Sequence, residues 1–283
     1  MQQNKAHFGI ALSGGGTRGF AHLGVLQALN EHGIQPDIIA GTSAGAIAGA
    51  MYASGIPPKD IHELLKSKDV MGFTRLHFPR KGLFTFDGLI KLLETNLDVT
   101  NIEELPIPFT ITATNLNKGC PHYFYSGNII ERVVASASIP VLFAPVEIDG
   151  YFYCDGGVYD NLPVKPLLNK CEKIIGVNIS PIQEETKDMN LIDVASRSFQ
   201  LTVNSTILNS VKRCDMFIEP EGVRKYGLLD SSHADDVYNA GYFSALAVLR
   251  EKGEKFARIP NTFDKTLLKL TKMFRAKKES RLN

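Results

Sequence analysis

Residues 38–53 read IIAGTSAGAIAGAMYA. Apolar residues 38–40 predict a short strand, and the small residues from Ala44 to Ala53 predict a closely packed helix. Between them lies Gly41-Thr42-Ser43-Ala44-Gly45, a G-x-S-x-G pattern. At a strand-to-helix turn this pattern is typical of a nucleophile elbow, which holds a serine hydroxyl outward at the helix start. The stretch predicts an α/β fold with Ser43 as the candidate nucleophile, although a tightly packed turn without chemistry would carry the same pattern.

The alternation of strand and helix continues on both sides of this stretch. Residues 8–12 predict a strand, and a helical pattern follows it up to Gly33. The further segments are strands at 109–114, 122–125, 174–179 and 216–218, and helices at 89–97, 129–135, 191–211 and 236–250. Alternation of this kind indicates a three-layer α/β/α fold with a mainly parallel central sheet. One antiparallel hairpin is expected, because residues 146–148 and 151–153 flank Asp149-Gly150.

A glycine-rich turn follows the first predicted strand. Residues 13–19 read SGGGTRG, and consecutive glycines let backbone N–H groups converge on an oxyanion or a phosphate. Gly14-x-Gly16-x-x-Gly19 also fits a dinucleotide-binding fingerprint, with Asp37 as the ribose-binding acid. However, Asp37 precedes the second strand, whereas that fold needs an acid at the strand's end. An oxyanion loop is the favoured interpretation, and nucleotide binding stays as an alternative.

A third motif, Asp155-Gly156-Gly157, follows the predicted hairpin. A carboxylate next to two glycines can approach another backbone closely, whereas an aspartate in an ordinary turn serves as a local cap. Taken alone, this motif favours the cap.

In order and spacing the three motifs resemble those of the patatin-like phospholipase family. Residues 113–116, 136–140 and 143–145 also look like that family. The resemblance implies a patatin-like fold in which Gly14, Gly15 and Gly16 form the oxyanion hole and Ser43 is the nucleophile. It makes Asp155 the only catalytic partner of Ser43. It also suggests that Arg18 binds a substrate phosphate, although a surface arginine is an equally good interpretation. The implied substrate is a lipid or other acyl ester, and no metal or cofactor is required.

A Ser43–Asp155 dyad needs an unusually basic carboxylate, because an aspartate with a pKa near 3.9 accepts a proton poorly from an alcohol. Burial would raise that pKa, and Phe152, Tyr153 and Val158 surround Asp155 in sequence with apolar bulk. We expect Ser43 to form an acyl-enzyme while Asp155 carries the proton.

Two other functions fit parts of the pattern. An α/β-hydrolase esterase would use a Ser43–Asp155–His233 triad, and the chain order permits it. However, only two short strands precede Ser43, and His233 lies in a polar segment that looks like a helix start. The other is a non-catalytic protein that uses the same fold to bind a lipid or a nucleotide.

The composition is that of a globular protein, with 44% hydrophobic and 22% charged residues. Residues 1–262 are expected to form one catalytic domain. Its acidic balance argues against nucleic-acid binding, because 24 basic and 29 acidic residues lie outside residues 265–283. The cysteines show no metal-binding or disulfide spacing, and we find neither a signal segment nor an apolar run long enough to cross a membrane. These features favour the cytoplasm.

Two segments raise the question of membrane contact. Residues 263–283 predict a basic amphipathic helix whose apolar face includes Phe263, Leu267, Leu270 and Phe274. This face fits either a peripheral contact with an anionic membrane or docking on the domain. Residues 71–86 contain four phenylalanines among basic residues, which fits either an apolar flap over an acyl pocket or a loop packed on the core.

Overall fold

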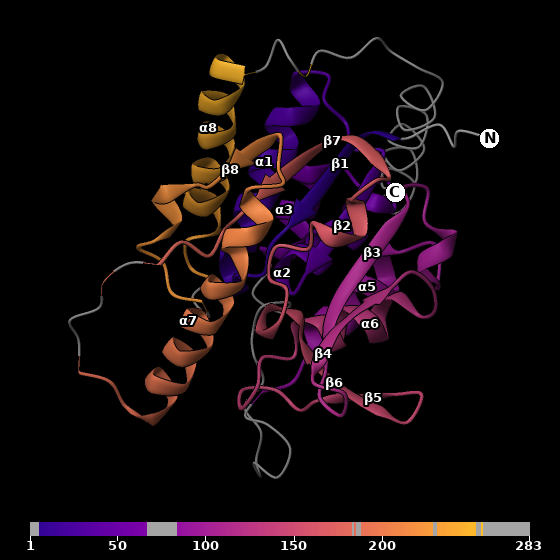
Figure 1. Cartoon of the computed structure of the whole chain (residues 1–283), viewed down its shortest axis with the longest axis vertical. Helices are drawn as coiled ribbons and strands as arrows, with labels where there is room; N and C mark the ends of the chain where they lie inside the picture. Colours follow the sequence, from indigo (N-terminus) through magenta and orange to yellow (C-terminus); the bar gives the residue numbers. More distant parts are fainter. Residues whose placement is uncertain are drawn as a thin grey trace, which may run out of the picture.

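The computed structural model of the chain describes residues 6–66, 84–182, 184, 188–228, 231–252 and 256. Its centre is an eight-stranded sheet in the order β5-β6-β3-β2-β1-β7-β8, with β4 paired to β3 off this path (Figure 1). The strands are β1 (Ala6–Leu12), β2 (Ile38–Thr42), β3 (Phe109–Asn115), β4 (Cys120–Phe124), β5 (Val146–Ile148), β6 (Tyr151–Asp155), β7 (Cys171–Val177) and β8 (Met216–Ile218).

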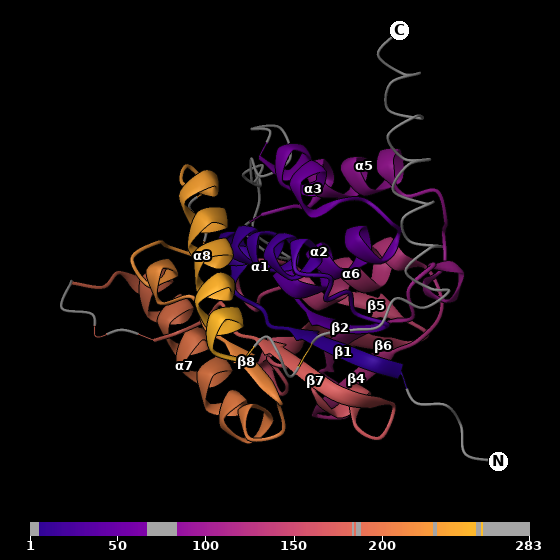
Figure 2. The ribbon, with the colours of Figure 1, turned by 90° about the horizontal axis from the view of Figure 1, so that it is seen from above.

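Helices cover both faces of the sheet. They are α1 (Phe20–Glu31), α2 (Ala44–Ala53), α3 (Pro58–Leu65), α5 (Asp87–Asn96), α6 (Ile129–Ala137), α7 (Leu191–Val211) and α8 (Ala234–Lys252). Figure 2 shows α1, α2 and α6 over one face, with α3 and α5 stacked beyond them, and α7 on the opposite side. The predicted three-layer α/β/α fold is therefore confirmed. Among the described residues, no helix is long and apolar enough to cross a membrane.

A separate hydrophobic core lies on each face of the sheet, because side chains along a strand point alternately to the two faces. In β1, Ile10 and Leu12 pack into the larger core under α1 and α2, while Ala11 points to a smaller one. Opposite faces of a strand alternate residue by residue, so one short apolar run can serve both cores. Leu167 and Ile207, from the turn before β7 and from α7, close the smaller core.

The sheet contains more antiparallel pairing than the single hairpin expected. β1, β2, β3, β7 and β8 pair in parallel, while β3–β4, β3–β6 and β5–β6 are antiparallel. The predicted β5–β6 hairpin is confirmed, and both turn residues, Asp149 and Gly150, have positive φ as a tight hairpin turn requires. The β3–β4 pair was missed as a hairpin because its turn, residues 116–119, carries no such dipeptide signal.

One edge of β3 is shared by two strands that run toward each other. Thr112 of β3 pairs with Thr42, the last residue of β2, and the adjacent Ala113 pairs with Asp155, the last residue of β6. β4 takes the other edge, since Ala113 also pairs with His122. The carboxyl ends of β2 and β6 therefore meet at neighbouring residues of β3.

Helices α1 and α8 cross at two glycines, and Figure 2 shows them side by side. A Cβ atom added to Gly24 of α1 would lie 2.0 Å from the carbonyl oxygen of Tyr238 in α8. A Cβ atom added to Gly241 of α8 would lie 2.1 Å from the carbonyl oxygen of Ala21 in α1. Each glycine lets the other helix's backbone approach, so the crossing depends on both.

Two predicted features lie largely outside the described residues. These are the amphipathic tail at 263–283, together with the domain boundary before it, and most of the proposed flap at 71–86. The last part of that flap is described: the backbone N–H of Phe84 donates to the carbonyl of Leu142 at 3.0 Å, and Phe86 stacks on Phe143 with ring centroids 4.0 Å apart. This end of the segment packs on the domain.

Candidate active site

Ser43 lies in a tight turn between β2 and α2. Its φ of 52° and ψ of −118° are unusual for a residue other than glycine. The glycines on either side are required by close contacts, because a Cβ atom at Gly45 would lie 2.2 Å from the carbonyl oxygen of Leu12. The backbone N–H of Ser43 donates to Ser136 Oγ at 2.8 Å, and that hydroxyl donates to the Thr112 carbonyl at 2.6 Å. The predicted strand–turn–helix geometry is confirmed, and neighbouring elements hold the turn in place.

Asp155 ends β6 and is 1% exposed. Its Oδ1 accepts from the backbone N–H of Gly157 at 2.8 Å, so the local cap expected of an isolated aspartate is present. Burial raises the pKa of Asp155 to about 7, and the Ser43 hydroxyl and Gly157 N–H oppose part of that rise. The apolar surroundings differ from those expected, since Tyr153 is buried but Phe152 is 43% exposed. Phe152 therefore does not supply the desolvation.

Ser43 and Asp155 line one cavity together. Asp155 Oδ2 is buried without a hydrogen-bond partner among the described residues, and the Ser43 hydroxyl is near enough to Asp155 to oppose part of the rise in its pKa. Hydrogen bonds between catalytic groups are often long in ligand-free sites and shorten when substrate binds. The apolar part of the cavity wall is formed by Ile139, Ile182, Phe199, Val203 and Leu228. The arrangement joins a serine at a strained turn to a carboxyl that is half-protonated near neutral pH.

The glycine-rich loop lines the same cavity at the carboxyl end of β1. The expectation that all three glycine amides face an oxyanion needs correction at Gly14. Its N–H already donates to Asn161, at 3.1 Å to Oδ1 and 3.3 Å to the carbonyl oxygen. For the N–H groups of Gly15 and Gly16, the described part of the chain offers no acceptor. Two backbone donors therefore remain available to a ligand.

The comparisons with known proteins agree with this geometry. The family model for patatin-like phospholipases matches residues 10–168, which is more than half of the chain and includes the glycine loop, Ser43 and Asp155. The chain belongs to the patatin-like phospholipase family. An uncharacterized NTE family protein of Mycobacterium bovis is 35% identical over 160 residues, covering 56% of this chain and 44% of that protein.

Two further matches cover nearly the whole chain. Lysophospholipase NTE1 of Scheffersomyces stipitis is 28% identical over 298 residues, covering 92% of this chain but 19% of the relative. This patatin-like chain thus spans less than half the length of the curated relatives named here. The crystal structure of VipD from Legionella pneumophila aligns with 96% of the chain and 74% of VipD, with a TM-score of 0.50 and 17% identity. The VipD match shows a shared fold.

Arg18 is buried in this patatin-like structure, with 6% of its surface exposed. The interpretation as a surface arginine is therefore wrong. Its guanidinium donates to the carbonyl oxygens of Tyr226, Arg224 and Pro181 at 2.8, 3.3 and 3.5 Å. Arg18 also lines the cavity, so binding of a substrate phosphate stays a prediction. These three contacts show a second role, which is to hold the chain around residues 181 and 224–226 against the glycine loop.

His22 contacts the start of the glycine-rich turn through Ser13. It is fully buried, and its Nε2 lies 2.7 Å from the carbonyl oxygen of Ser13. Burial lowers the pKa of His22 to about 4, so the ring is neutral at pH 7 and Nε2–H donates to Ser13. The contact gives His22 a structural role, which is to hold the Ser13 carbonyl group next to the glycine-rich turn.

The structure does not bring His233 or Asp37 to the site. The His233 side chain is 47% exposed and does not line the cavity, and its Nδ1 lies 3.4 Å from Asp236 Oδ2. Asp37 Oδ2 accepts from the backbone N–H groups of His7 and Phe8 at the amino end of β1, about 20 Å along that strand from the glycine loop. The dinucleotide fingerprint needs an acid at the carboxyl end of the second strand, so the position of Asp37 contradicts it.

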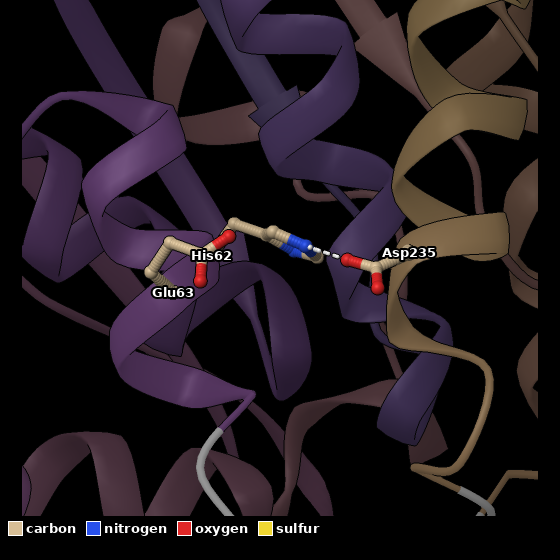
Figure 3. Close-up of side chains that lie close together, drawn as sticks. All are labelled: His62, Glu63 and Asp235. Atoms are coloured by element: carbon tan, nitrogen blue, oxygen red, sulfur yellow. Dashed lines mark hydrogen bonds and ion pairs between the residues drawn. The ribbon is translucent and has the colours of Figure 1, made fainter.

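The described residues contain one group with the spacing of metal ligands, His62, Glu63 and Asp235 (Figure 3). His62 Nε2 lies 2.7 Å from Asp235 Oδ1, and Lys66 Nζ lies 2.8 Å from Asp235 Oδ2. The Lys66 ammonium group already neutralises the Asp235 carboxylate. The contacts of Asp235 with His62 and Lys66 join α3 to the start of α8. It does not line the cavity with Ser43.

Sequence reasoning missed three parts of the site. Asn161 holds Gly14, Ser136 holds the Ser43 amide, and Phe199 and Val203 of α7 line the cavity. Ser136 lies in a segment that resembles the family, so a signal existed for it. No local pattern marks Asn161, because its partner Gly14 is 147 residues away.

Proposed function

We propose that this chain is a serine lipid acyl hydrolase of the phospholipase A, lysophospholipase or carboxylesterase type. The observation that carries the proposal is the shared cavity of Ser43 and Asp155, one at a strained turn and the other a buried carboxyl with a pKa of about 7. Family membership and a relative named lysophospholipase support a lipid ester as substrate. The apolar wall of the cavity suits an acyl chain.

The proposed reaction uses groups of the chain itself. Ser43 Oγ attacks the ester carbonyl carbon and transfers its proton to Asp155 Oδ2, which has no competing partner among the described residues. The N–H groups of Gly15 and Gly16 stabilise the negative oxygen of the tetrahedral intermediate. Asp155 then gives the proton to the departing alcohol, leaving Ser43 acylated. In the second half, Asp155 takes a proton from water, whose oxygen attacks the acyl carbon. The bond from that carbon to Ser43 Oγ then breaks, Oγ takes the proton back from Asp155, and the carboxylic acid leaves.

Burial explains how a carboxylate can act without a histidine. A base works best when its pKa lies near the working pH. Desolvation raises the pKa of Asp155 from its usual 3.8 to about 7. We further propose that the chain works in the cytoplasm at a lipid surface. The four described cysteines are free, which suits a reducing compartment.

The test is hydrolysis of a short-chain acyl ester by purified variants. Ser43→Ala and Asp155→Asn should each lower kcat/KM by at least about 1,000-fold. In a catalytic pair, the loss of either residue removes the contribution of both to the rate. A fluorophosphonate probe should label the wild-type chain, and peptide mapping should place the label on Ser43.

His233→Ala is the matched control and should retain wild-type activity. A loss as large as that of Ser43→Ala would replace the dyad by a triad. If the folded wild-type chain neither hydrolyses esters nor takes the label, the catalytic proposal is overturned in favour of a binding protein.

A further inference from the structure

Asn161 lies six residues after Asp155 and lines the same cavity as Ser43. It is 1% exposed and fixed from two sides. Its backbone N–H donates to Thr206 Oγ1 of α7 at 3.1 Å, while its carbonyl oxygen and Oδ1 both accept from the N–H of Gly14. Its position relative to the glycine loop is therefore set by the fold.

The residue before it is anchored just as firmly. The carbonyl oxygen of Asp160 accepts from Thr42 Oγ1 at 3.0 Å, and Asp160 Oδ2 accepts from the Tyr123 hydroxyl at 2.6 Å. Thr42 directly precedes the candidate nucleophile. The backbone at 160–161 is thus tied to both the elbow and the oxyanion loop, which is the rigidity that a precise hydrogen-bond donor needs.

The orientation of the Asn161 amide follows from its partner. Gly14 N–H must point at an acceptor, so the oxygen of the amide faces Gly14 and the NH₂ group is the other end. Asn161 Nδ2 is buried and has no hydrogen-bond partner among the described residues. A buried donor without a partner is costly, and such groups in native structures call for an explanation.

The explanation lies in what else lines this cavity. The N–H groups of Gly15 and Gly16 also have no acceptor among the described residues, and Ser43 lines the same space. We propose that Asn161 is a further catalytic residue whose Nδ2–H donates to the ester carbonyl oxygen and, more strongly, to the oxyanion. This inference rests on the proposed acyl-ester hydrolysis and names a third donor for that site.

The step balances without another reactant. The bond from Ser43 Oγ to the carbonyl carbon forms, the carbonyl π pair moves to oxygen, and the Oγ proton goes to Asp155. Asn161 Nδ2–H stabilises the new charge and keeps its proton. When the intermediate collapses, the pair returns, the bond to the leaving alcohol breaks, and that alcohol takes the proton from Asp155.

A competing partner for the amide is Asp155 Oδ2, which is also buried without a hydrogen bond. The two possibilities differ in what they change. A donor to the oxyanion lowers the activation barrier at every pH, whereas a donor to Asp155 favours its ionised form and lowers its pKa. The pH-independent maximum of kcat and the midpoint of the pH profile therefore separate them.

The experiment compares Asn161→Ala and Asn161→Asp with wild type over a full pH profile, using p-nitrophenyl butyrate. Asn161→Ala removes the donor, and the backbone carbonyl of residue 161 still accepts from Gly14. Asn161→Asp keeps the side-chain acceptor and the shape, so it tests the same point if the alanine variant does not fold. Both should lower the maximum kcat about 100-fold or more, with KM within about threefold of wild type.

Asn115→Ala is the matched control. Asn115 is equally buried, its Nδ2 also has no partner among the described residues, and its Oδ1 accepts from Lys118 N–H at 2.9 Å, but it does not line the cavity. Its maximum kcat should match wild type. The inference is overturned if the folded Asn161 variants keep the wild-type maximum, or if only their pH midpoint moves. An inactive, unlabelled wild-type chain would instead overturn the proposed function, and this inference with it.

Discussion

At neutral pH Asp155 is divided between its neutral and ionised forms, because burial raises its pKa to about 7. In the proposed mechanism, only the ionised form can accept the Ser43 proton. We therefore expect kcat/KM for a neutral ester to rise about tenfold per pH unit below 7 and to level off above it. A profile that is flat from pH 5 to 9 would contradict this role.

Stability offers an independent readout of the same group. The pKa of Asp155 is higher in the folded chain than its usual 3.8, so the folded state binds the extra proton between about pH 4 and 7. Ionisation thus destabilises the wild type as pH rises through this window, by on the order of 4 kcal/mol in total. Asp155→Asn should melt several degrees above wild type at pH 8, and the difference should vanish near pH 4. Equal melting temperatures at pH 8 would contradict the raised pKa.

The sequence predicts individual site residues unevenly. Ser43 and Asp155 lie in short motifs whose spacing reflects local backbone requirements, so both could be singled out before the structure. The engagement of Gly14 and the burial of Arg18 could not, because their partners lie 147 and 163 to 208 residues away. Hydrogen bonds of that range depend on the folded topology.

Among the elements, the crossing of α1 and α8 gives a sharp prediction. Gly24→Ala and Gly241→Ala should each destabilise the fold by about 2 kcal/mol or more, because the added methyl group overlaps backbone that cannot move away. Alanine improves intrinsic helix propensity by about 1 kcal/mol, so a loss of stability would identify the crossing as its cause. Urea unfolding followed by circular dichroism measures the change.

Gly222→Ala serves as the control, because its added Cβ atom would lie 3.2 Å from the Cβ atom of Ala240 and meets no backbone. It should change stability by less than either helix variant. If Gly24→Ala is as stable as wild type or more so, the two helices do not cross as closely as described.

Local patterns predict most elements better than they predict pairing. The ranges of α2 and α7 and of β8 are confirmed to the residue, because small-residue runs and apolar periodicity are local properties. The antiparallel arrangement around β3 was missed, since it depends on which strands reach its edges. Which strands pair with the two edges of β3 depends on the tertiary structure, and no single segment of the sequence determines it.

For the molecule as a whole, we expect the tail at 263–283 to increase binding to anionic membranes. Residues 265–283 carry seven basic and one acidic residue, and each basic residue near such a surface can add up to about 1 kcal/mol. Deleting 265–283 should lower co-sedimentation with anionic vesicles at least about tenfold, while binding to zwitterionic vesicles stays unchanged.

High salt should weaken binding of the full-length chain in the same way, because it screens these charges. Equal sedimentation of the full-length and truncated chains would rule out the membrane role and favour docking of the tail on the domain.

The shared edge of β3 also bears on how the chain folds. Ser43 and Asp155 are 112 residues apart in sequence, and they meet because β2 and β6 both pair with this one strand. Closing loops of that length costs entropy before any contact forms, so such pairings arise late compared with helices and the β5–β6 hairpin. A refolding chain can regain much of its helical content and still lack the assembled Ser43–Asp155 pair until both strands have paired with β3.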